Sequence, residues 1–170
     1  DPGAGAQTMT PATVAAARIR PLAKRDLASV VRIDAIHTGA EQRAYWTRLF
    51  REFLAPGPGR QPVALAAEVD GDVAGFLLAD VRAFEFGSEP CGWILEVGVN
   101  PNEARQGIAS SLLAEAVRRL RAAGVSTVRT MVRRNNVPVL TFFRTNGFAG
   151  GPYVQLELVD DAIAQLTTRT

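Results

Sequence analysis

The chain has 170 residues, 47% of them hydrophobic, and a formal net charge of +2. That is enough apolar material for one domain with a sizeable core, and the small charge excess does not by itself indicate nucleic-acid binding. The single cysteine excludes an internal disulfide and a multi-cysteine zinc site, so a reducing cytoplasm is permitted. No run of about 18 apolar residues is present, so we expect no membrane span.

We expect one domain over residues 17–160, with tails at 1–16 and 161–170. The first residues are rich in Ala, Gly, Thr and Pro, and none of them up to Ala17 is charged after Asp1. They lack the basic start and leucine-rich core of a signal peptide, and their composition is typical of a flexible tail.

The N-terminal half predicts one strand, two helices and a hairpin, at residues 17–21, 25–36, 41–54, 63–69 and 73–81. The hairpin turn is Asp70-Gly71-Asp72, a common signal for a short β connection. The second helix carries a wide apolar stripe, of which we assign Leu49, Phe50 and Phe53 to the core. Tyr45 and Trp46 lie on the same helix, and the sequence leaves their role open.

The stretch from Ile94 to Leu113 organises the rest of the chain, because it predicts a buried strand, a turn and a helix in succession. The strand covers residues 94–99, and Asn100 and Pro101 open the turn. The first N–H groups of a helix lack intrahelical partners, and the helix dipole places positive charge beside them. Such a helix start binds anions.

The residues at this helix start suit a phosphate or pyrophosphate. Gly107 removes a Cβ where a ligand would approach the backbone, Ala109 adds little bulk, and Ser110 supplies a hydroxyl donor. Arg105 brings positive charge to the rim. A tight strand–helix connection with nothing bound fits the same residues, so the motif alone is a weak signal.

A second strand and helix follow downstream and strengthen that signal. Residues 126–132 predict a strand, and residues 136–148 predict a short helix with Asn136 as its cap and Gly147 at its end. Gly150-Gly151-Pro152 then precedes a last alternating strand, expected at residues 153–159.

At these two segments the sequence resembles the GNAT superfamily of N-acetyltransferases, most closely the ribosomal-protein-alanine (N-terminal) acetyltransferase group. The family's acetyl-CoA loop reads Arg/Gln-x-x-Gly-x-Gly/Ala and corresponds to residues 104–109. Gly107 and Ala109 match this pattern. Ala104 stands where the family has a long polar side chain.

The family's later pattern, Asn-x-x-Ala-x-x-aromatic-Tyr-x-x-x-Gly-Phe, corresponds to residues 136–148. Val139 replaces the Ala and Phe143 replaces the Tyr. In many members that Tyr is placed to protonate the departing CoA thiolate, which a Phe cannot do.

The resemblance implies a mixed α/β fold, with a mostly antiparallel sheet of six to seven strands and about four helices on its two faces. It also implies acetyl-CoA as cosubstrate and no metal. The residues that we expect to contact acetyl-CoA are Val97, Gly98, Val99, Arg105, Gln106, Gly107, Ile108, Ala109, Ser110, Asn136, Phe143 and Arg144.

The implied reaction is attack by a neutral amine on the thioester, and Glu96 is our candidate general base. It lies within an apolar strand where the family often carries an acid; a carboxylate paired with an Arg or bonded to backbone is the structural alternative. Backbone N–H groups at Val97 to Val99 are expected to stabilise the oxyanion, with a bulge at Gly98 freeing one of them. Tyr153 is a candidate substitute acid, and His37 reads as a cap or surface residue.

Three functions fit the sequence. The first is an acetyl-CoA-dependent N-acetyltransferase of a primary amine, either a protein N-terminus or a small molecule. The second is a catalytically weakened CoA-binding module with a regulatory role, favoured by Ala104 and Phe143. The third is a phosphate-binding domain of another fold. We expect a cytoplasmic monomer or homodimer with no nucleic-acid or membrane partner.

Overall fold

The computed structural model describes residues 16–160 and residue 163, with only the backbone for residues 104–106. The expected tails at 1–16 and 161–170 therefore lie almost wholly outside the described residues. The chain divides into two compact units, the first ending at Met131 and the second beginning at Val132.

The first unit contains a five-stranded sheet with the strand order β1-β2-β3-β4-β5. Its first three pairings are antiparallel, whereas β4 and β5 run parallel. The Asp70-Gly71 turn between β2 and β3 is confirmed, with both residues at positive φ. The strand bounds are β1 Arg18–Pro21, β2 Val63–Val69, β3 Asp72–Arg82, β4 Cys91–Val99 and β5 Val128–Arg129.

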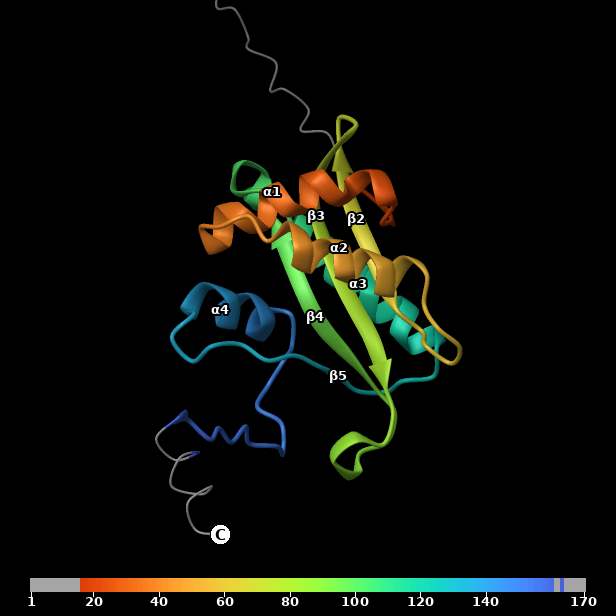
Figure 1. Ribbon diagram of the computed structural model, residues 1–170, viewed down its shortest axis with the longest axis vertical. Helices are drawn as coiled ribbons and strands as arrows, with labels where there is room; N and C mark the ends of the chain where they lie inside the picture. Colours follow the sequence, from red (N-terminus) through yellow and green to blue (C-terminus); the bar gives the residue numbers. More distant parts are fainter. Residues whose placement is uncertain (1–15, 161–162, 164–170) are drawn as a thin grey trace, which may run out of the picture. The chain divides into compact units, whose positions relative to one another are not determined.

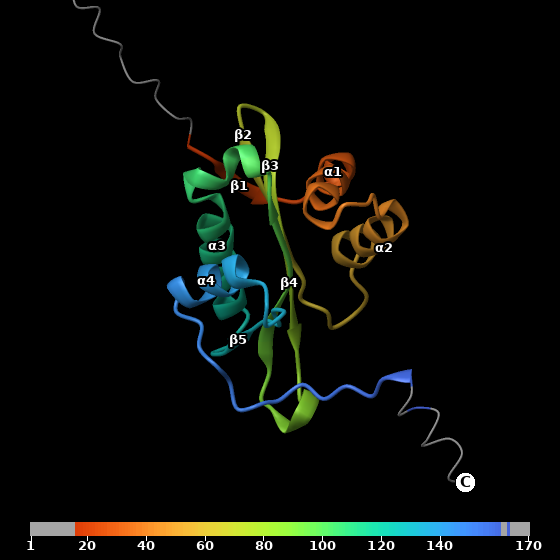
Figure 2. The same cartoon turned by 90° about the vertical axis from the view of Figure 1, so that its left-hand side faces the viewer.

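Helices cover both faces of this sheet. Figures 1 and 2 show α1 (Leu27–Thr38) and α2 (Arg43–Leu54) on one face and α3 (Ile108–Ala122) on the other. The layer under α1 and α2 is a dense apolar core that includes the fully buried ring of Trp46. Leu49, Phe50 and Phe53 also belong to this core, as expected. Among the described residues, none of the helices is sufficiently long and apolar to cross a membrane.

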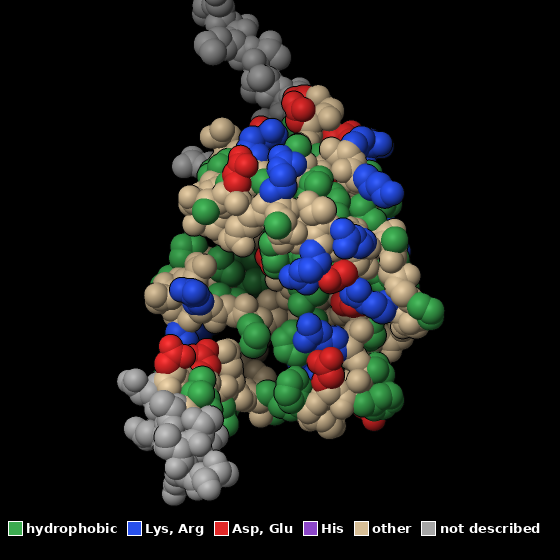
Figure 3. All heavy atoms as spheres, viewed as in Figure 1, with side chains coloured by type: hydrophobic (Ala, Val, Ile, Leu, Met, Phe, Trp, Pro, Cys, Tyr) green, Lys and Arg blue, Asp and Glu red, His purple; other side chains and the backbone are tan. Residues whose placement is uncertain are grey.

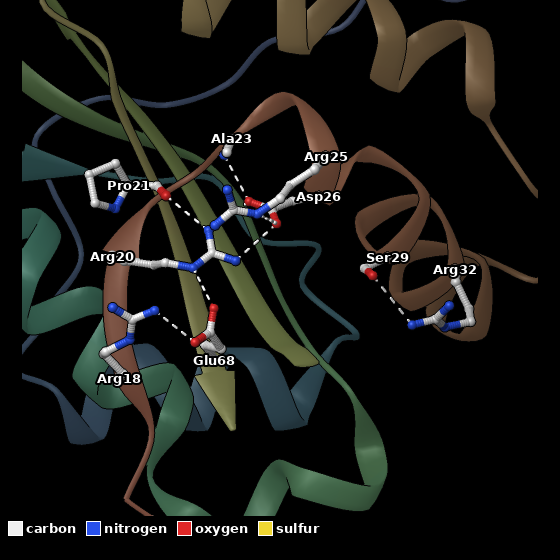
Figure 4. A network of polar contacts seen from close by, with 9 residues as sticks. All are labelled: Arg18, Arg20, Pro21, Ala23, Arg25, Asp26, Ser29, Arg32 and Glu68. Atoms are coloured by element: carbon white, nitrogen blue, oxygen red, sulfur yellow. Dashed lines mark hydrogen bonds and ion pairs between the residues drawn. The ribbon is translucent and has the colours of Figure 1, made fainter. Parts of the chain in front are cut away.

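A buried ion-pair network fixes the first strand to the start of α1 (Figure 4). The guanidinium of Arg20 donates to both carboxylate oxygens of Asp26, at 2.8 and 2.9 Å, and its Nε donates to Glu68 on β2 at 2.7 Å. Asp26 also accepts the backbone N–H of Ala23 at 2.7 Å and is 3% exposed. These contacts satisfy a carboxylate that would otherwise be costly to bury.

The bulge in the central strand lies at Leu95, so the bulge expected at Gly98 is wrong. Opposite β3, Glu96 pairs with Leu78 and Ile94 pairs with Ala79, which leaves Leu95 as the extra residue of β4. Gly98 stays in register, opposite Phe76. Its missing side chain makes room for the Phe76 ring, because a Cβ there would lie 2.7 Å from that ring.

The second unit contains α4 (Val137–Thr145). The side-chain oxygen of Asn136 accepts the N–H of Val139 at 3.3 Å, which confirms the predicted cap. Gly147 has a φ of +90° just beyond the helix, as its predicted role as the end signal requires. Phe143 is 4% exposed and packs edge-on against Phe148, with the ring centroids 5.0 Å apart.

Two expected strands differ from the structure: one is shorter and one does not form. The second difference leaves the described sheet with five strands and not six to seven. The strand predicted at 126–132 is only Val128–Arg129. Just beyond it, the Thr130 hydroxyl donates to the Ile94 carbonyl at 3.2 Å. Residues 153–159 form no strand, and Leu156 there is 89% exposed. Alternation provides the apolar face of a strand, but a strand also needs a hydrogen-bonding neighbour.

Candidate active site

The C-terminal half of β4 presents backbone groups away from β3. The N–H of Asn100 donates to the Ala74 carbonyl at 2.8 Å, so Asn100 belongs to a hydrogen-bonded antiparallel pair. Alternation along the strand then directs the polar groups of Val97 and Val99 away from β3, and those of Gly98 toward it. On the opposite edge β5 pairs with β4 only at Gly92 and Trp93. We expected the amides of Val97, Gly98 and Val99 to be available to a ligand. Those of Val97 and Val99 point away from β3, whereas that of Gly98 does not.

His37 lies at the C-terminal end of β4. Its Nε2 lies 2.8 Å from the Val99 carbonyl oxygen, and because a carbonyl can only accept, the ring nitrogen is the donor. The contact joins the last turn of α1 to the last residue of β4. The histidine is thus a tether between two elements and not a free surface side chain.

The start of α3 keeps the geometry of an anion site. Gly107 has a φ of +69°, and a Cβ built on it would meet nothing within 4 Å. The first helical hydrogen bond runs from the Ser111 N–H to the Gly107 carbonyl at 3.0 Å, so the amides of Ile108 and Ala109 precede it at the positive end of the helix dipole.

The expected cofactor residues at this helix start contribute in different ways. The Ile108 side chain is fully buried, so only its backbone can face a ligand. Ala109 is partly buried, and Ser110 is exposed on the first turn. Arg105 and Gln106 belong to the 3-10 turn before Gly107, and their side chains are outside the described part of the chain.

Glu96 lies on the opposite face of β4 from α3 and contacts the helical layer. The Tyr45 hydroxyl on α2 donates to its Oε1. Burial raises the pKa of Glu96, the Tyr45 hydrogen bond works against this rise, and the negative charge of Asp34 adds to it, so that the pKa lies above that of an ordinary glutamate. A raised pKa makes the Glu96 carboxylate a stronger base than that of an ordinary glutamate, which favours a role in proton transfer.

The contact between Tyr45 and Glu96 was not predictable from the sequence. The two residues are 51 positions apart. The helical stripe places Tyr45 next to Trp46, but it does not identify which of them meets the central strand. The structure assigns Trp46 to the core, where its Nε1 donates to Asp34 at 2.9 Å, and Tyr45 to the site.

The remaining candidates lie in the second unit. Asn136 uses its side-chain oxygen to cap α4, and Phe143 is buried in the aromatic cluster of its own unit. Arg144 is exposed on α4, and Tyr153 is 46% exposed. Their expected roles with acetyl-CoA stay predictions. Within the described residues, no group of three or more His, Cys, Asp or Glu side chains is placed to hold a metal ion.

Comparison with known proteins agrees with this arrangement of strand, loop and helix. The model of the acetyltransferase (GNAT) family matches residues 27–148. A mycothiol acetyltransferase of Saccharomonospora viridis is 32% identical over 87 residues, which cover 49% of this chain and 28% of that protein. The chain therefore matches less than a third of that relative's length.

Solved structures share the fold at low sequence identity. The aminoglycoside 6'-N-acetyltransferase AAC(6')-Ig of Acinetobacter haemolyticus has a TM-score of 0.70 at 20% identity, covering 84% of this chain and 98% of that one. An aminoglycoside N-acetyltransferase AAC(6')-Iy in complex with CoA has a TM-score of 0.73 at 19% identity, covering 84% and 94%. The fold, the family match over well over half of the chain and the site geometry agree: this chain belongs to the GNAT family of acetyltransferases.

Proposed function

We propose that this chain is an acetyl-CoA-dependent N-acetyltransferase that transfers the acetyl group directly to a primary amine. One observation carries the proposal. On β4, a partly buried glutamate of raised pKa, Glu96, is followed by two residues, Val97 and Val99, whose backbone groups face away from β3. A proton acceptor and a row of hydrogen-bond donors thus lie on one strand.

Acetyl-CoA suits the described groups. The backbone of Val97 and Val99 can pair with the amide-containing arm of CoA as an added strand would. The amides of Ile108 and Ala109 suit its pyrophosphate, and the open space at Gly107 lets a phosphate approach the backbone. Arg105, Gln106 and Ser110 are proposed to contact the same phosphates.

The chemical step follows from these assignments. The amine nitrogen attacks the thioester carbon, Glu96 takes a proton from the amine directly or through water, and the C–S bond breaks to release the CoA thiolate. A protein N-terminus has a pKa of about 8, so a base is needed to keep the attacking amine neutral. One of the Val97 and Val99 amides is proposed as the donor to the oxyanion, and the other as the donor to the CoA arm.

Phe143 cannot protonate the leaving thiolate, because its side chain has no acidic proton. We propose Tyr153 or solvent water for this step. The Asn136 amide and Arg144 are proposed to contact the CoA arm and its phosphates, respectively.

The acceptor is a protein N-terminus or a small-molecule amine. The ribosomal-protein-alanine resemblance favours the former, whereas the names of the similar proteins, mycothiol and aminoglycoside acetyltransferases, favour the latter. Basic side chains gather on the face shown in Figure 3. On α2, Arg43, Arg48 and Arg51 are exposed. We propose a cytoplasmic monomer or homodimer, with neither nucleic acid nor membrane as a partner.

One observation favours a second candidate function. Phe143 stands where many members of the family have the Tyr that protonates the CoA thiolate, and it is buried among other rings. The chain therefore lacks the usual proton donor at this position. A CoA-binding module with weakened catalysis and a regulatory role is the alternative.

Release of free thiol from acetyl-CoA separates the two functions. The purified chain is incubated with acetyl-CoA and a panel of N-terminal peptides and small amines. Turnover with at least one amine supports the enzyme. CoA binding without turnover on any amine supports the module, and it contradicts the proposed transfer.

A further inference from the structure

We propose that Tyr45 is a positioning residue for acetyl transfer: its hydroxyl holds one oxygen of the Glu96 carboxylate and leaves proton removal to the other, Oε2. This inference rests on the proposed function, because it takes Glu96 as the general base. It assigns a role to a residue on α2 that lies outside both motifs of the family resemblance.

The contact itself joins two layers of the fold. Tyr45 is on α2 and Glu96 is on β4, and the phenol donates directly to Oε1. Both side chains are only partly buried, so solvent or an acceptor can still reach the pair. A carboxylate offers about four acceptor positions, and one donor at Oε1 leaves Oε2 able to accept a proton.

Tyr45 is itself held from two sides. The neighbouring Trp46 ring meets it edge-on at 5.5 Å and meets Phe76 of β3 at 5.0 Å. Trp46 is fully buried and donates its Nε1 to Asp34 on α1 at 2.9 Å. The Arg48 guanidinium lies 5.5 Å from the centre of the Tyr45 ring. A phenol held in this way fixes the direction in which the Glu96 carboxylate points.

The charged and titratable groups around Glu96 determine how the Tyr45 hydrogen bond affects the ionisation of Glu96. Asp34 from α1 raises the pKa of Glu96, while Tyr45 from α2 lowers it. Arg48 and Asp34 act on Tyr45, whose own pKa is raised by burial and by the Glu96 carboxylate. His37 from α1 is engaged with the Val99 carbonyl. The phenol therefore remains protonated, and it stabilises the ionised form of the base.

Loss of the hydroxyl should thus change the ionisation of Glu96 and not only the packing. In Tyr45→Phe the ring remains, but the donor that stabilises the carboxylate is gone. The pKa of Glu96 then rises further, since burial and Asp34 act unopposed. The base is ionised only at higher pH, and the carboxylate is no longer oriented.

The test compares Tyr45→Phe with Thr47→Val and Glu96→Gln in the full chain. Thr47 is the matched control, because its hydroxyl on the same helix donates to the Arg43 carbonyl, at 2.8 Å. For Tyr45→Phe we expect about a tenfold loss of kcat/KM at neutral pH, the size of one hydrogen bond to a charged group. The acid limb of the pH–rate profile should move to higher pH, with CoA affinity unchanged. Thr47→Val should match the parent chain.

A carbon-13 NMR titration of the Glu96 carboxyl measures the same shift without turnover. The positioning role would be overturned if Tyr45→Phe had the same acid limb and the same Glu96 titration as the parent chain. A loss of activity in Glu96→Gln would still support Glu96 as the base in that case. A normal rate and pH profile in Glu96→Gln would instead overturn the assignment of the base, and with it this inference.

Discussion

The Phe76 ring on β3 fills the space that a side chain at Gly98 on β4 would occupy. A Cβ on Gly98 would lie 2.7 Å from both Cε1 and Cζ of that ring. Phe76 is 2% exposed and also packs against Trp46, so the ring has little room to move. The central strand is thereby fitted closely to the helical layer that carries Tyr45.

Substitution Gly98→Ala should therefore destabilise the chain by about 1–3 kcal/mol, the usual cost of overpacking a core. Gly57→Ala is the matched control, because a Cβ at Gly57 meets nothing within 4 Å and its φ is not positive. Urea denaturation of both variants measures the difference. Equal stability of the two variants would show that the β3–β4 contact is not as tight as described.

A second prediction concerns the start of α3. Gly107→Ala adds a methyl group where we place the CoA phosphates, and it also strains a residue at a φ of +69°. We expect CoA affinity to fall about tenfold, a change of about 1.4 kcal/mol. Isothermal titration calorimetry measures this change.

Gly124→Ala provides the control at the other end of the same helix. Gly124 has a φ of +90° and likewise open space around its Cβ position, so both variants should lose about 1 kcal/mol of stability from backbone strain. Only Gly107→Ala should lose CoA affinity. If the two variants bind CoA equally well, the phosphates do not lie at Gly107.

The pH dependence of stability should report the Asp26 network. Burial alone would raise the pKa of Asp26, but the hydrogen bonds from Arg20 and from the Ala23 N–H lower it below the ordinary value. A carboxyl group with a depressed folded-state pKa contributes stability above its unfolded pKa of about 3.9 and loses it as the pH falls through the folded value.

Substitution Asp26→Asn should cost about 3 kcal/mol at pH 7, because it breaks a buried ion pair and leaves Arg20 without this partner. The difference from the parent should shrink as the pH falls below about 4, where the parent protonates as well. Asp72→Asn, at an exposed position, should follow the parent curve. Urea melts across the pH range test this, and a constant difference at all pH values would exclude the linkage.

Removal of the proposed base gives the fourth prediction. Glu96→Gln should lower kcat by about 10²–10⁴-fold near neutral pH, the usual contribution of a general base. In the parent chain, activity should rise with pH through a value above that of an ordinary glutamate, because burial raises the pKa of Glu96. In the variant this rise should disappear, and activity should increase only at the higher pH that makes the amine neutral by itself. A pH–rate profile unchanged by the substitution would remove Glu96 from this role.

Local signals in the sequence predicted those parts of the fold that depend on local chemistry. The turn at Asp70-Gly71 and the caps of α4 were predictable because a turn residue or a cap acts within a few positions of the chain. The strand predicted at 94–99 lies within β4, which begins three residues earlier at Cys91, and its apolar run made it recognisable. The helix after it was predictable because its apolar residues recur at helical spacing.

The parts that were missed depend on distant partners. Neither the bulge at Leu95 nor the early end of β5 has a local signal, because each is set by the register of a neighbouring strand. The alternation at 153–159 was compatible with a strand, but alternation does not supply a pairing partner. The hydrogen bond from Tyr45 to Glu96 was missed for the same reason.

The most direct test of the account is calorimetric titration of the full chain with acetyl-CoA. We expect saturable binding of one acetyl-CoA per chain that weakens as salt is added, because the phosphates are held by helix-end amides and nearby positive charge. The absence of any measurable binding at millimolar acetyl-CoA would contradict the central claim that β4 and the start of α3 together form a CoA site.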